Sequence, residues 1–492
     1  MRIHLLLLLL CFGFLLSAQT LHYNILFEKA QTGGKLKLDV TVDFYPSTSG
    51  TTRFVLPEQI NWSSGLLDCY RKFEAKGATC RLEGNTLSVF TPKGKEGPVQ
   101  LHYELIQNFP GEQVTVETSC SPILLADYIH VPGECLFLVP RHYRLFDVGV
   151  SWKGLPKGWQ IQNSFATGQT EQQFQSSNSD WLRTNWVAGD FRIHRGQAHG
   201  KPIAFAIRGK WVFDDQTLFD IIQKTVESQR TTWDDLDIPF YSVTMIPFVL
   251  PKGQRMVGRA RTGQCLGYGG YQSFIVLASD DCTLDPLINL FHHEMMHDWI
   301  GGKLNVGPGN ETTSMRWLAE GFTDYYALRN RWKTGFITTP VFLKELNSDF
   351  LAAHYADPCG EMSNLEVEKN YFSNETCENV PYRRGCILAF YLDARIRKQS
   401  DNNKTLHNLM ADLLDYTYGH DRTLVDHYDF FVDALGEYLG DDAPTFLQQY
   451  VEAGKRIPLS AYVVPDFLTI KASATGAPQM GIVAGKEGEF RR

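Results

Sequence analysis

The chain has 492 residues, of which 43% are hydrophobic and 21% are charged. This apolar content is enough for ordinary packed cores, and the length alone predicts two or three domains. Lys and Arg number 47 against 55 Asp and Glu, so the net charge is −8. A negative charge without a basic stripe argues against a nucleic-acid partner.

Residues 1–18 have the pattern of a cleaved signal peptide. Arg2 supplies a positive start, an apolar run extends from Leu5 to Leu16, and Ser17 and Ala18 are small residues before a cleavage site. The alternative is an uncleaved anchor, but about twelve apolar residues are too few to cross a bilayer of about 30 Å. We therefore expect a secreted or periplasmic protein with no stable membrane span.

The cysteines agree with export. Of ten cysteines, Cys11 lies in the predicted signal peptide and Cys386 lies on an apolar helical pattern. The other eight form pairs that are close in sequence, as expected of short disulfide loops in an oxidising compartment. These predicted pairs are Cys69 with Cys80, Cys120 with Cys135, Cys265 with Cys282, and Cys359 with Cys377. The alternative is that several are buried thiols.

The texture of the chain changes near residue 209. Residues 19–208 consist of short alternating runs such as KLKLDVTVDFY and VQLHYELI, which predict an antiparallel β-sandwich or saddle. Residues 209–462 begin with one helix and buried strands and continue with helical patterns, which predicts an α+β domain with a helical C-terminal half. Residues 463–492 form a C-terminal tail too short for another domain.

A zinc-binding pattern occurs in HHEMMH, residues 292–297. His293 and His297 are four residues apart, so on a helix both imidazoles reach one ion from the same face. Glu294 follows His293 and is placed to act as general base beside the metal. A match of this kind also arises by chance, and its neighbours must support it.

Support comes from a second helical pattern, WLAEGFTDYY at 317–326. Glu320 supplies a third ligand there, and three protein ligands with one open position are typical of catalytic zinc. Asp324 lies on the same face and is expected to accept a hydrogen bond from the free ring nitrogen of His293 or His297. The alternative for both acids is an ordinary exposed position on a helix.

The motifs HEMMHDWIGG, WLAEGFTDYY and PYRRGCILAFYLDARIR together resemble those of the aminopeptidase N and leukotriene hydrolase family of gluzincin metallopeptidases. The closing FLQQYVEAGKRIP resembles the glycyl aminopeptidase family. The resemblance implies an N-terminal saddle followed by a thermolysin-like catalytic domain, with one Zn²⁺ per chain. It also implies that Tyr382, in PYRRG, donates a hydrogen bond to the oxyanion that forms during hydrolysis.

One departure concerns the substrate strand of that family. Residues 269–273 read GGYQS, so Gly269, Gly270 and Gln272 fall at substrate-binding positions, with Gln272 where the family has a glutamate. That glutamate receives the free α-amine of the substrate, and a neutral amide cannot make the same charge-assisted contact. The bond that is cut, terminal or internal, is therefore left open.

The residues predict a secreted metallopeptidase that hydrolyses peptides or proteins with a zinc-activated water and Glu294 as general base. One alternative is a strict aminopeptidase in which another acid replaces the amine-binding glutamate. Another alternative is a non-catalytic protein that binds peptides or glycans with a peptidase domain that has lost its activity. Epoxide hydrolysis, known in the resembling family, is neither supported nor excluded. The oligomeric state and the side-chain preference cannot be read from the sequence.

Overall fold

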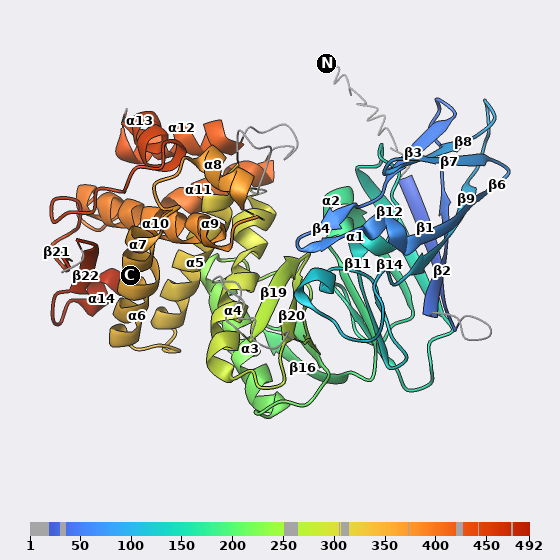
Figure 1. The fold of residues 1–492 in the computed structure, drawn as a ribbon, viewed down its shortest axis with the longest axis horizontal. Helices are drawn as coiled ribbons and strands as arrows, with labels where there is room; N and C mark the ends of the chain where they lie inside the picture. Colours follow the sequence, from blue (N-terminus) through green and yellow to red (C-terminus); the bar gives the residue numbers. More distant parts are fainter. Residues whose placement is uncertain are drawn as a thin grey trace, which may run out of the picture. The chain divides into compact units, whose positions relative to one another are not determined.

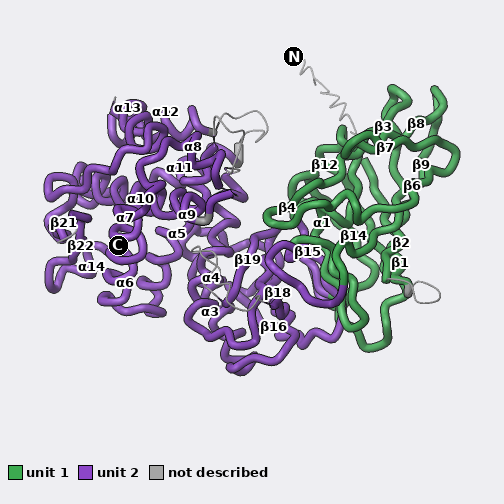
Figure 2. The backbone as a smooth tube through the Cα atoms, in the orientation of Figure 1, with its two compact units in different colours: residues 1–110, 120–161, 168–183 green, residues 111–119, 162–167, 184–492 purple. Residues whose placement is uncertain are grey.

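The computed structural model describes residues 19–29, 36–249, 264–304, 306, 314–371, 373–419, 427–440, 442–473 and 476–492. The predicted signal peptide lies outside these residues. Figure 1 shows the elements in chain order, and Figure 2 shows that they form two compact units. Unit 1 comprises residues up to 110, 120–161 and 168–183, and unit 2 comprises 111–119, 162–167 and 184–492.

Unit 1 is built on a six-stranded sheet in the order β14-β12-β1-β2-β9-β6. Neighbouring strands are antiparallel except for β1 and β12, which run parallel. Buried and partly exposed residues alternate along β2, because successive side chains point to opposite faces of a strand. A separate three-stranded antiparallel sheet has the order β3-β8-β7. The sheet-rich first half was predicted from this alternation and is confirmed.

The strands of the N-terminal part have the following bounds: β1 Gln19–Lys29, β2 Leu36–Phe44, β3 Thr51–Val55, β4 Gln59–Ile60, β5 Ser63–Ser64, β6 Tyr70–Lys76, β7 Thr79–Glu83, β8 Thr86–Phe90, β9 Val99–Ile106, β10 Ile123–Leu124, β11 Tyr128–Pro132, β12 Leu145–Lys153, β13 Gln160–Asn163, β14 Glu171–Ser177 and β15 Asn185–Gly189. The short helices of this part are η1 Leu66–Cys69, η2 Val116–Thr118, α1 Gly133–Leu136 and α2 Asn178–Leu182.

Unit 2 contains a mixed five-stranded sheet in the order β16-β17-β18-β20-β19. The central strands β17, β18 and β20 run parallel to one another, and each edge strand, β16 or β19, is antiparallel to the strand beside it. The bounds are β16 Arg192–Ala198, β17 Lys201–Ile207, β18 Tyr241–Pro247, β19 Cys265–Gly270 and β20 Ser273–Ala278. All residues of β20 are buried, as expected of a strand covered on both faces.

Helices form most of the rest of unit 2. The first, α3, begins after Asp214, whose side chain accepts a hydrogen bond from the Thr217 backbone N–H and so caps the helix. The helical bounds are α3 Asp215–Thr232, α4 Leu284–Met296, η3 Asp298–Lys303, α5 Arg316–Lys333, α6 Thr339–Glu345, η4 Leu346–Ala352, α7 Ala353–Ala356, α8 Asn364–Asn370, α9 Glu375–Glu378, α10 Val380–Gln399, α11 Leu406–Gly419, α12 His427–Leu439, α13 Ala443–Leu447, η5 Gln448–Glu452 and α14 Glu487–Arg491. The predicted helical second half is thus confirmed.

The C-terminal residues pack onto this helical core. A hairpin of β21 Leu468–Ala472 and β22 Pro478–Ile482 precedes α14, and Phe490 on α14 is fully buried. The Phe490 ring centroid lies 5.7 Å from that of Trp332 and 6.0 Å from that of Phe342. The longest continuous segment of unit 2 starts at residue 184, whereas the predicted boundary is at 209. The difference includes β16 and β17, which belong to the five-stranded sheet of unit 2. The predicted domain limits remain predictions.

One of the four predicted disulfides is present. Cys359 and Cys377 are bonded, whereas the other three pairs that the sequence offered are not bonded to each other in the structure. For Cys69 and Cys80 the reason is topological: Cys69 is buried just before β6, and Cys80 has already entered a different sheet on β7. Proximity in sequence therefore did not bring the sulfur atoms together. None of the described helices is long and apolar enough to cross a membrane.

Candidate metal centre

Two helices bring the three predicted ligands together. His293 and His297 lie one turn apart at the C-terminal end of α4, and Glu320 lies in the second turn of α5. Their ligand atoms are mutually within 4.8 Å, and His293 is almost fully buried. The i, i+4 spacing places both imidazoles on one face of α4, and α5 packs against that face.

The geometry of these three atoms fits a tetrahedral zinc ion. The Nε2 atoms of His293 and His297 are 3.1 Å apart, and each lies 3.4 Å from Oε2 of Glu320. Ligands at about 2.1 Å from a tetrahedral centre are separated by about 3.4 Å, which is the length of a tetrahedron edge. The donor set of two imidazoles and one carboxylate is also that of catalytic zinc sites.

The other ring nitrogens are fixed by separate partners. Nδ1 of His293 lies 2.9 Å from Oδ1 of Asp324, and Nδ1 of His297 lies 3.1 Å from the carbonyl oxygen of Ile300. When each Nδ1 carries the proton, each Nε2 is left with its lone pair directed at the centre. Of the two histidines that the sequence offered to Asp324, the structure places His293 beside it.

A break after α4 makes the second of these bonds possible. Gly301 has φ +102°, a conformation that side-chain-bearing residues rarely adopt, and Ile300 is non-helical. The chain therefore leaves helical geometry at Ile300, three residues after His297, and the Ile300 carbonyl turns back towards the His297 ring. The dipeptide Gly301 and Gly302 in the sequence provides this turn.

The electrostatics of the cluster favour a cation. Burial by itself opposes charge on His293, but Asp324 and Glu320 outweigh it and raise its pKa to about 10. Burial likewise opposes charge on Glu320, but His297 and His293 outweigh it and lower the pKa of that carboxyl well below its usual range. The carboxylates thus create a negative potential that a proton or a metal ion can satisfy.

Glu294 lies between the sheet and the metal ligands. Its side chain is buried, which raises the pKa of the carboxyl group, with His293 and His297 acting in the opposite direction. A Cβ placed on Gly267 of β19 would lie 2.7 Å from Cγ of Glu294, closer than real contacts allow. The absent side chain at Gly267 therefore leaves the space in which Glu294 sits.

Tyr382, in the first turn of α10, completes the group. Its ring is roughly parallel to that of His293 at a centroid distance of 6.0 Å, and its hydroxyl lies 3.2 Å from that of Tyr371. Burial, followed by the charge of Glu320, raises the pKa of Tyr382 well above its usual value. The phenol is therefore a neutral hydrogen-bond donor at any physiological pH.

Tyr371 is itself held from the other side. The guanidinium carbon of Arg316 lies 3.8 Å from the centroid of the Tyr371 ring, within cation–π range. Arg316 also forms a bidentate pair with Glu368, at 2.7 and 3.1 Å, and Glu368 accepts a further hydrogen bond from Ser314. A chain of buried contacts thus supports Tyr382 from outside the metal centre.

The predicted substrate strand is the edge strand β19 and its turn. Gly269 pairs with Phe274 and Gly270 with Ser273, and Gln272 occupies the turn with φ +48°. The Gln272 amide nitrogen lies 3.3 Å from the Tyr271 hydroxyl. A Cβ on Gly269 would make an ordinary 3.5 Å contact with Cβ of His297, so this residue lies directly over the zinc helix.

Sequence reasoning missed two groups of residues here. Gly267 lies two positions before Gly269, so the alternation of glycines in GYGG could have shown that β19 presents a bare face to α4. Tyr371 and Arg316 carry no local signal of their own, because their role depends on packing between α5, α8 and α10. All predicted site residues nevertheless lie on or beside α4, α5, α10 and the β19 turn.

Comparison with protein-family models gives no match, and comparison with curated proteins gives none either. Solved structures do match. An aminopeptidase N family protein from Idiomarina loihiensis superimposes with a TM-score of 0.71 at 18% identity, over 92% of this chain and 79% of that one. An M1 zinc metallopeptidase from Deinococcus radiodurans gives 0.54 at 11% identity, over 90% and 94%.

A third neighbour, yeast LTA4 hydrolase, gives a TM-score of 0.52 at 12% identity, over 90% of this chain and 68% of that one. These are the kinds of protein whose motifs the sequence resembles, and each comparison spans both the sheet-rich and the helical part. The chain therefore has the fold of the aminopeptidase N and M1 zinc metallopeptidase family.

Proposed function

We propose that the chain is a zinc-dependent metallopeptidase that hydrolyses peptide bonds. The observation that carries this proposal is the triangle formed by two Nε2 atoms and one carboxylate oxygen, with sides of 3.1, 3.4 and 3.4 Å. The fold supports it, since a variant of the M1 zinc metallopeptidase from Deinococcus radiodurans, which shares this fold, was solved bound to a Tyr-Ser-Ala substrate. His293, His297 and Glu320 would hold one Zn²⁺.

Zinc bound there would polarise the scissile carbonyl and lower the pKa of a water to about 7. Glu294 accepts a proton from the attacking water and passes it to the leaving amine. Burial raises the pKa of Glu294, so the carboxyl group is protonated more easily. This protonated form then transfers the proton to the leaving amine. Tyr382 donates a hydrogen bond from its phenolic hydroxyl to the carbonyl oxygen of the substrate as negative charge develops on that oxygen.

The position of the cleaved bond depends on the β19 turn. An edge strand offers backbone groups to an extended peptide, so a substrate can align along β19 beside Glu294. Gln272 at the turn provides an amide oxygen rather than a carboxylate for any free amine. This arrangement is compatible with cleavage inside a peptide chain. It is equally compatible with removal of a terminal residue whose amine is bound by another acid.

Two further features belong to the proposal. The mixed sheet ending in β19, followed by the α4 zinc helix and the helical half, supports a thermolysin-like plan for the catalytic domain. The signal-peptide pattern of residues 1–18 and the bonded pair of Cys359 and Cys377 support secretion or export to the periplasm.

The deciding experiment is substitution of the base. Glu294→Gln keeps the size of the side chain but cannot accept the proton, so zinc content measured by atomic absorption should be unchanged while hydrolysis falls at least about 100-fold. Glu437→Gln, an exposed change on α12, is the matched control and should behave as wild type. Full activity in Glu294→Gln would remove it as the base.

Substrate class is tested separately with a mixed peptide library and mass spectrometry. Peptides with free and with blocked N-termini distinguish an aminopeptidase, which requires the free amine, from an endopeptidase, which does not. Stoichiometric zinc without cleavage of any library member would favour the alternative of a non-catalytic binding protein.

A further inference from the structure

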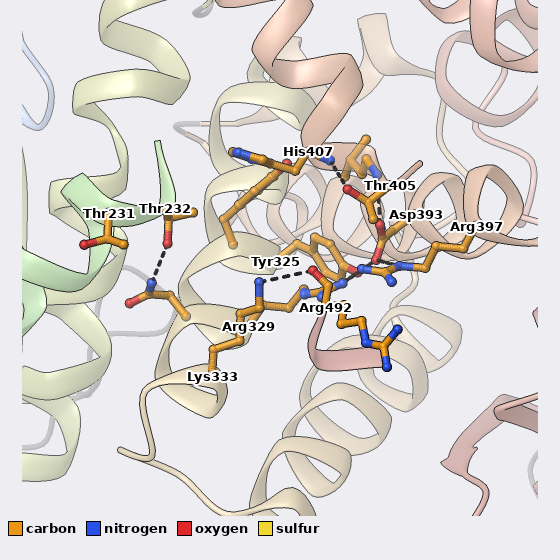
Figure 3. A pocket seen from close by; sticks show the side chains of 13 residues that line it. Thr231, Thr232, Tyr325, Arg329, Lys333, Asp393, Arg397, Thr405, His407 and Arg492 are labelled. Atoms are coloured by element: carbon orange, nitrogen blue, oxygen red, sulfur yellow. Dashed lines mark hydrogen bonds and ion pairs between the residues drawn. The ribbon is translucent and has the colours of Figure 1, made fainter. Parts of the chain in front are cut away.

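A cavity of about 320 Å³ lies in the helical part of unit 2, and none of the proposed zinc ligands lines it. Its walls come from the last turn of α3, the second half of α5, α10, the start of α11 and the residue after α14 (Figure 3). A volume of this size matches the lower end of small-molecule sites, which are mostly apolar with a few convergent polar groups.

The buried wall of the cavity carries more positive than negative charge. Arg329 and Arg397 both pair with Asp393, and all three side chains are nearly inaccessible. Asp393 also accepts hydrogen bonds from the Tyr325 hydroxyl at 2.7 Å and the Leu406 backbone N–H at 2.9 Å. One carboxylate, which accepts hydrogen bonds from Tyr325, Leu406 and both arginines, therefore faces two guanidinium groups.

Two more cations stand at the cavity. Lys333 and Arg492 line it, and Asp393 is the sole carboxylate side chain among the described lining residues. The Lys333 ammonium makes a long contact of 3.5 Å with the backbone oxygen of Arg492. Desolvation by the surrounding protein, and then repulsion from Arg329 and Arg397, lowers the pKa of Lys333 to about 8.

The remaining lining has an apolar part, beside the polar side chains of Thr231, Thr232, Asn330 and Thr405. Tyr326, Leu406 and the His407 ring line the cavity, and burial lowers the pKa of His407 to about 4, so the ring is neutral at pH 7. The buried Tyr326 hydroxyl and His407 Nδ1 have no hydrogen-bond partner among the described residues. Buried polar atoms normally have partners, so these two mark places where a ligand or ordered water would bind.

We propose that this cavity binds a small organic carboxylate with an apolar body. The carboxylate would lie against Lys333 and the Arg397 end of the cavity, where it offsets the excess charge, and its apolar body would contact Tyr326, Leu406 and the His407 ring. A metal cation would be repelled by this lining. A bare inorganic anion would satisfy the charge but would leave the apolar wall in contact with water.

Binding is tested on the full-length protein by thermal unfolding and calorimetry, with benzoate as the probe and benzamide as its neutral counterpart. A ligand that binds the folded state alone raises the melting temperature with concentration. We expect benzoate to do so with a dissociation constant of about 1 mM or lower, and benzamide to bind at least about tenfold more weakly. Chloride and phosphate at equal ionic strength serve as simple anions.

The variant Lys333→Gln removes a cation from the exposed mouth without disturbing the buried pair, and it should weaken benzoate binding at least about fivefold. Lys344→Gln on α6, which does not line the cavity, is the matched control with the same charge change. No stabilisation by benzoate, or equal binding of benzoate by wild type and Lys333→Gln, would overturn the proposal. If benzamide raised the melting temperature as much as benzoate, recognition of the carboxylate would be overturned. If chloride or phosphate did so, recognition of the apolar body would be overturned.

Discussion

Gly321 of α5 and Gly385 of α10 meet backbone to backbone. A Cβ added to Gly321 would lie 2.3 Å from Cα of Gly385, and one added to Gly385 would lie 1.8 Å from the carbonyl oxygen of Trp317. Neither position therefore accepts even a methyl group. Glu320 precedes one glycine and Tyr382 lies three residues before the other, so this crossing sets the separation of a proposed zinc ligand from the proposed oxyanion donor.

Gly385→Ala should force the two helices apart. We expect a loss of about 2 to 4 kcal/mol in the free energy of unfolding, as for an overpacked core, together with a large loss of hydrolysis. Gly436→Ala on α12 is the control, because a Cβ there meets nothing within 4 Å and Ala favours the helix by about 0.5 to 1 kcal/mol. Urea unfolding of both variants measures the difference. Equal free energies of unfolding for the two variants would contradict the close backbone contact of α5 and α10.

Gly267→Ala should displace the base rather than unfold the protein. The new methyl group would contact Glu294, so we expect kcat to fall at least about tenfold while zinc content is retained. Gly436→Ala on α12, where an added Cβ meets nothing within 4 Å, is the control and should keep kcat within about threefold. If the two variants lose kcat equally, Gly267 does not act by making space for Glu294.

Tyr371→Phe should lower kcat with little change in KM. The lost hydroxyl orients Tyr382, and a hydrogen bond of this kind contributes about 1 kcal/mol, or about fivefold in rate. The double variant Tyr371→Phe with Tyr382→Phe should be no slower than Tyr382→Phe alone. Additive losses would show that Tyr371 acts independently of Tyr382.

The stability of the helical part should fall in acid. Burial raises the pKa of Asp393, but Arg329 and Arg397 outweigh it and lower the pKa to about 2, from 3.8 in the unfolded chain. Because the folded pKa is the lower one, the contribution is present above about pH 4 and is lost as the pH falls towards 2. It amounts to about 2 kcal/mol.

Urea unfolding at several pH values below 5 would measure this loss. Asp393→Asn should be less stable at pH 7, because two buried guanidinium groups lose their counter-charge, and it should lose part of the acid dependence. An unchanged acid dependence in that variant would assign the effect to other carboxyl groups.

The sequence was informative where the chemistry is local to one helix. The spacing of His293 and His297, and of Glu320 and Asp324, predicts shared faces because the α-helix repeats every 3.6 residues. The alternating strands of the first half follow from the same kind of local periodicity. The structure brings these four side chains into one cluster, as their spacing suggested.

What could not be predicted depends on which elements touch. Gly267, Gly321 and Gly385 matter because of the atoms opposite them, and a glycine in a sequence does not reveal what it faces. The pair of Cys69 and Cys80 has the same cause, since nearness along the chain does not fix the sheet on which a cysteine lies. The contact of Tyr371 with Tyr382 depends likewise on how α8 and α10 pack.

The bond between Cys359 and Cys377 acts on the proposed site through chain entropy. It closes a loop with a sequence separation of 18, and Glu368 and Tyr371 both lie within that loop. A crosslink of this length removes about 3 kcal/mol of conformational freedom from the unfolded chain. The loop therefore loses less entropy when Tyr371 docks on Tyr382, and a reducing environment would make that docking less favourable without altering any residue at the metal centre.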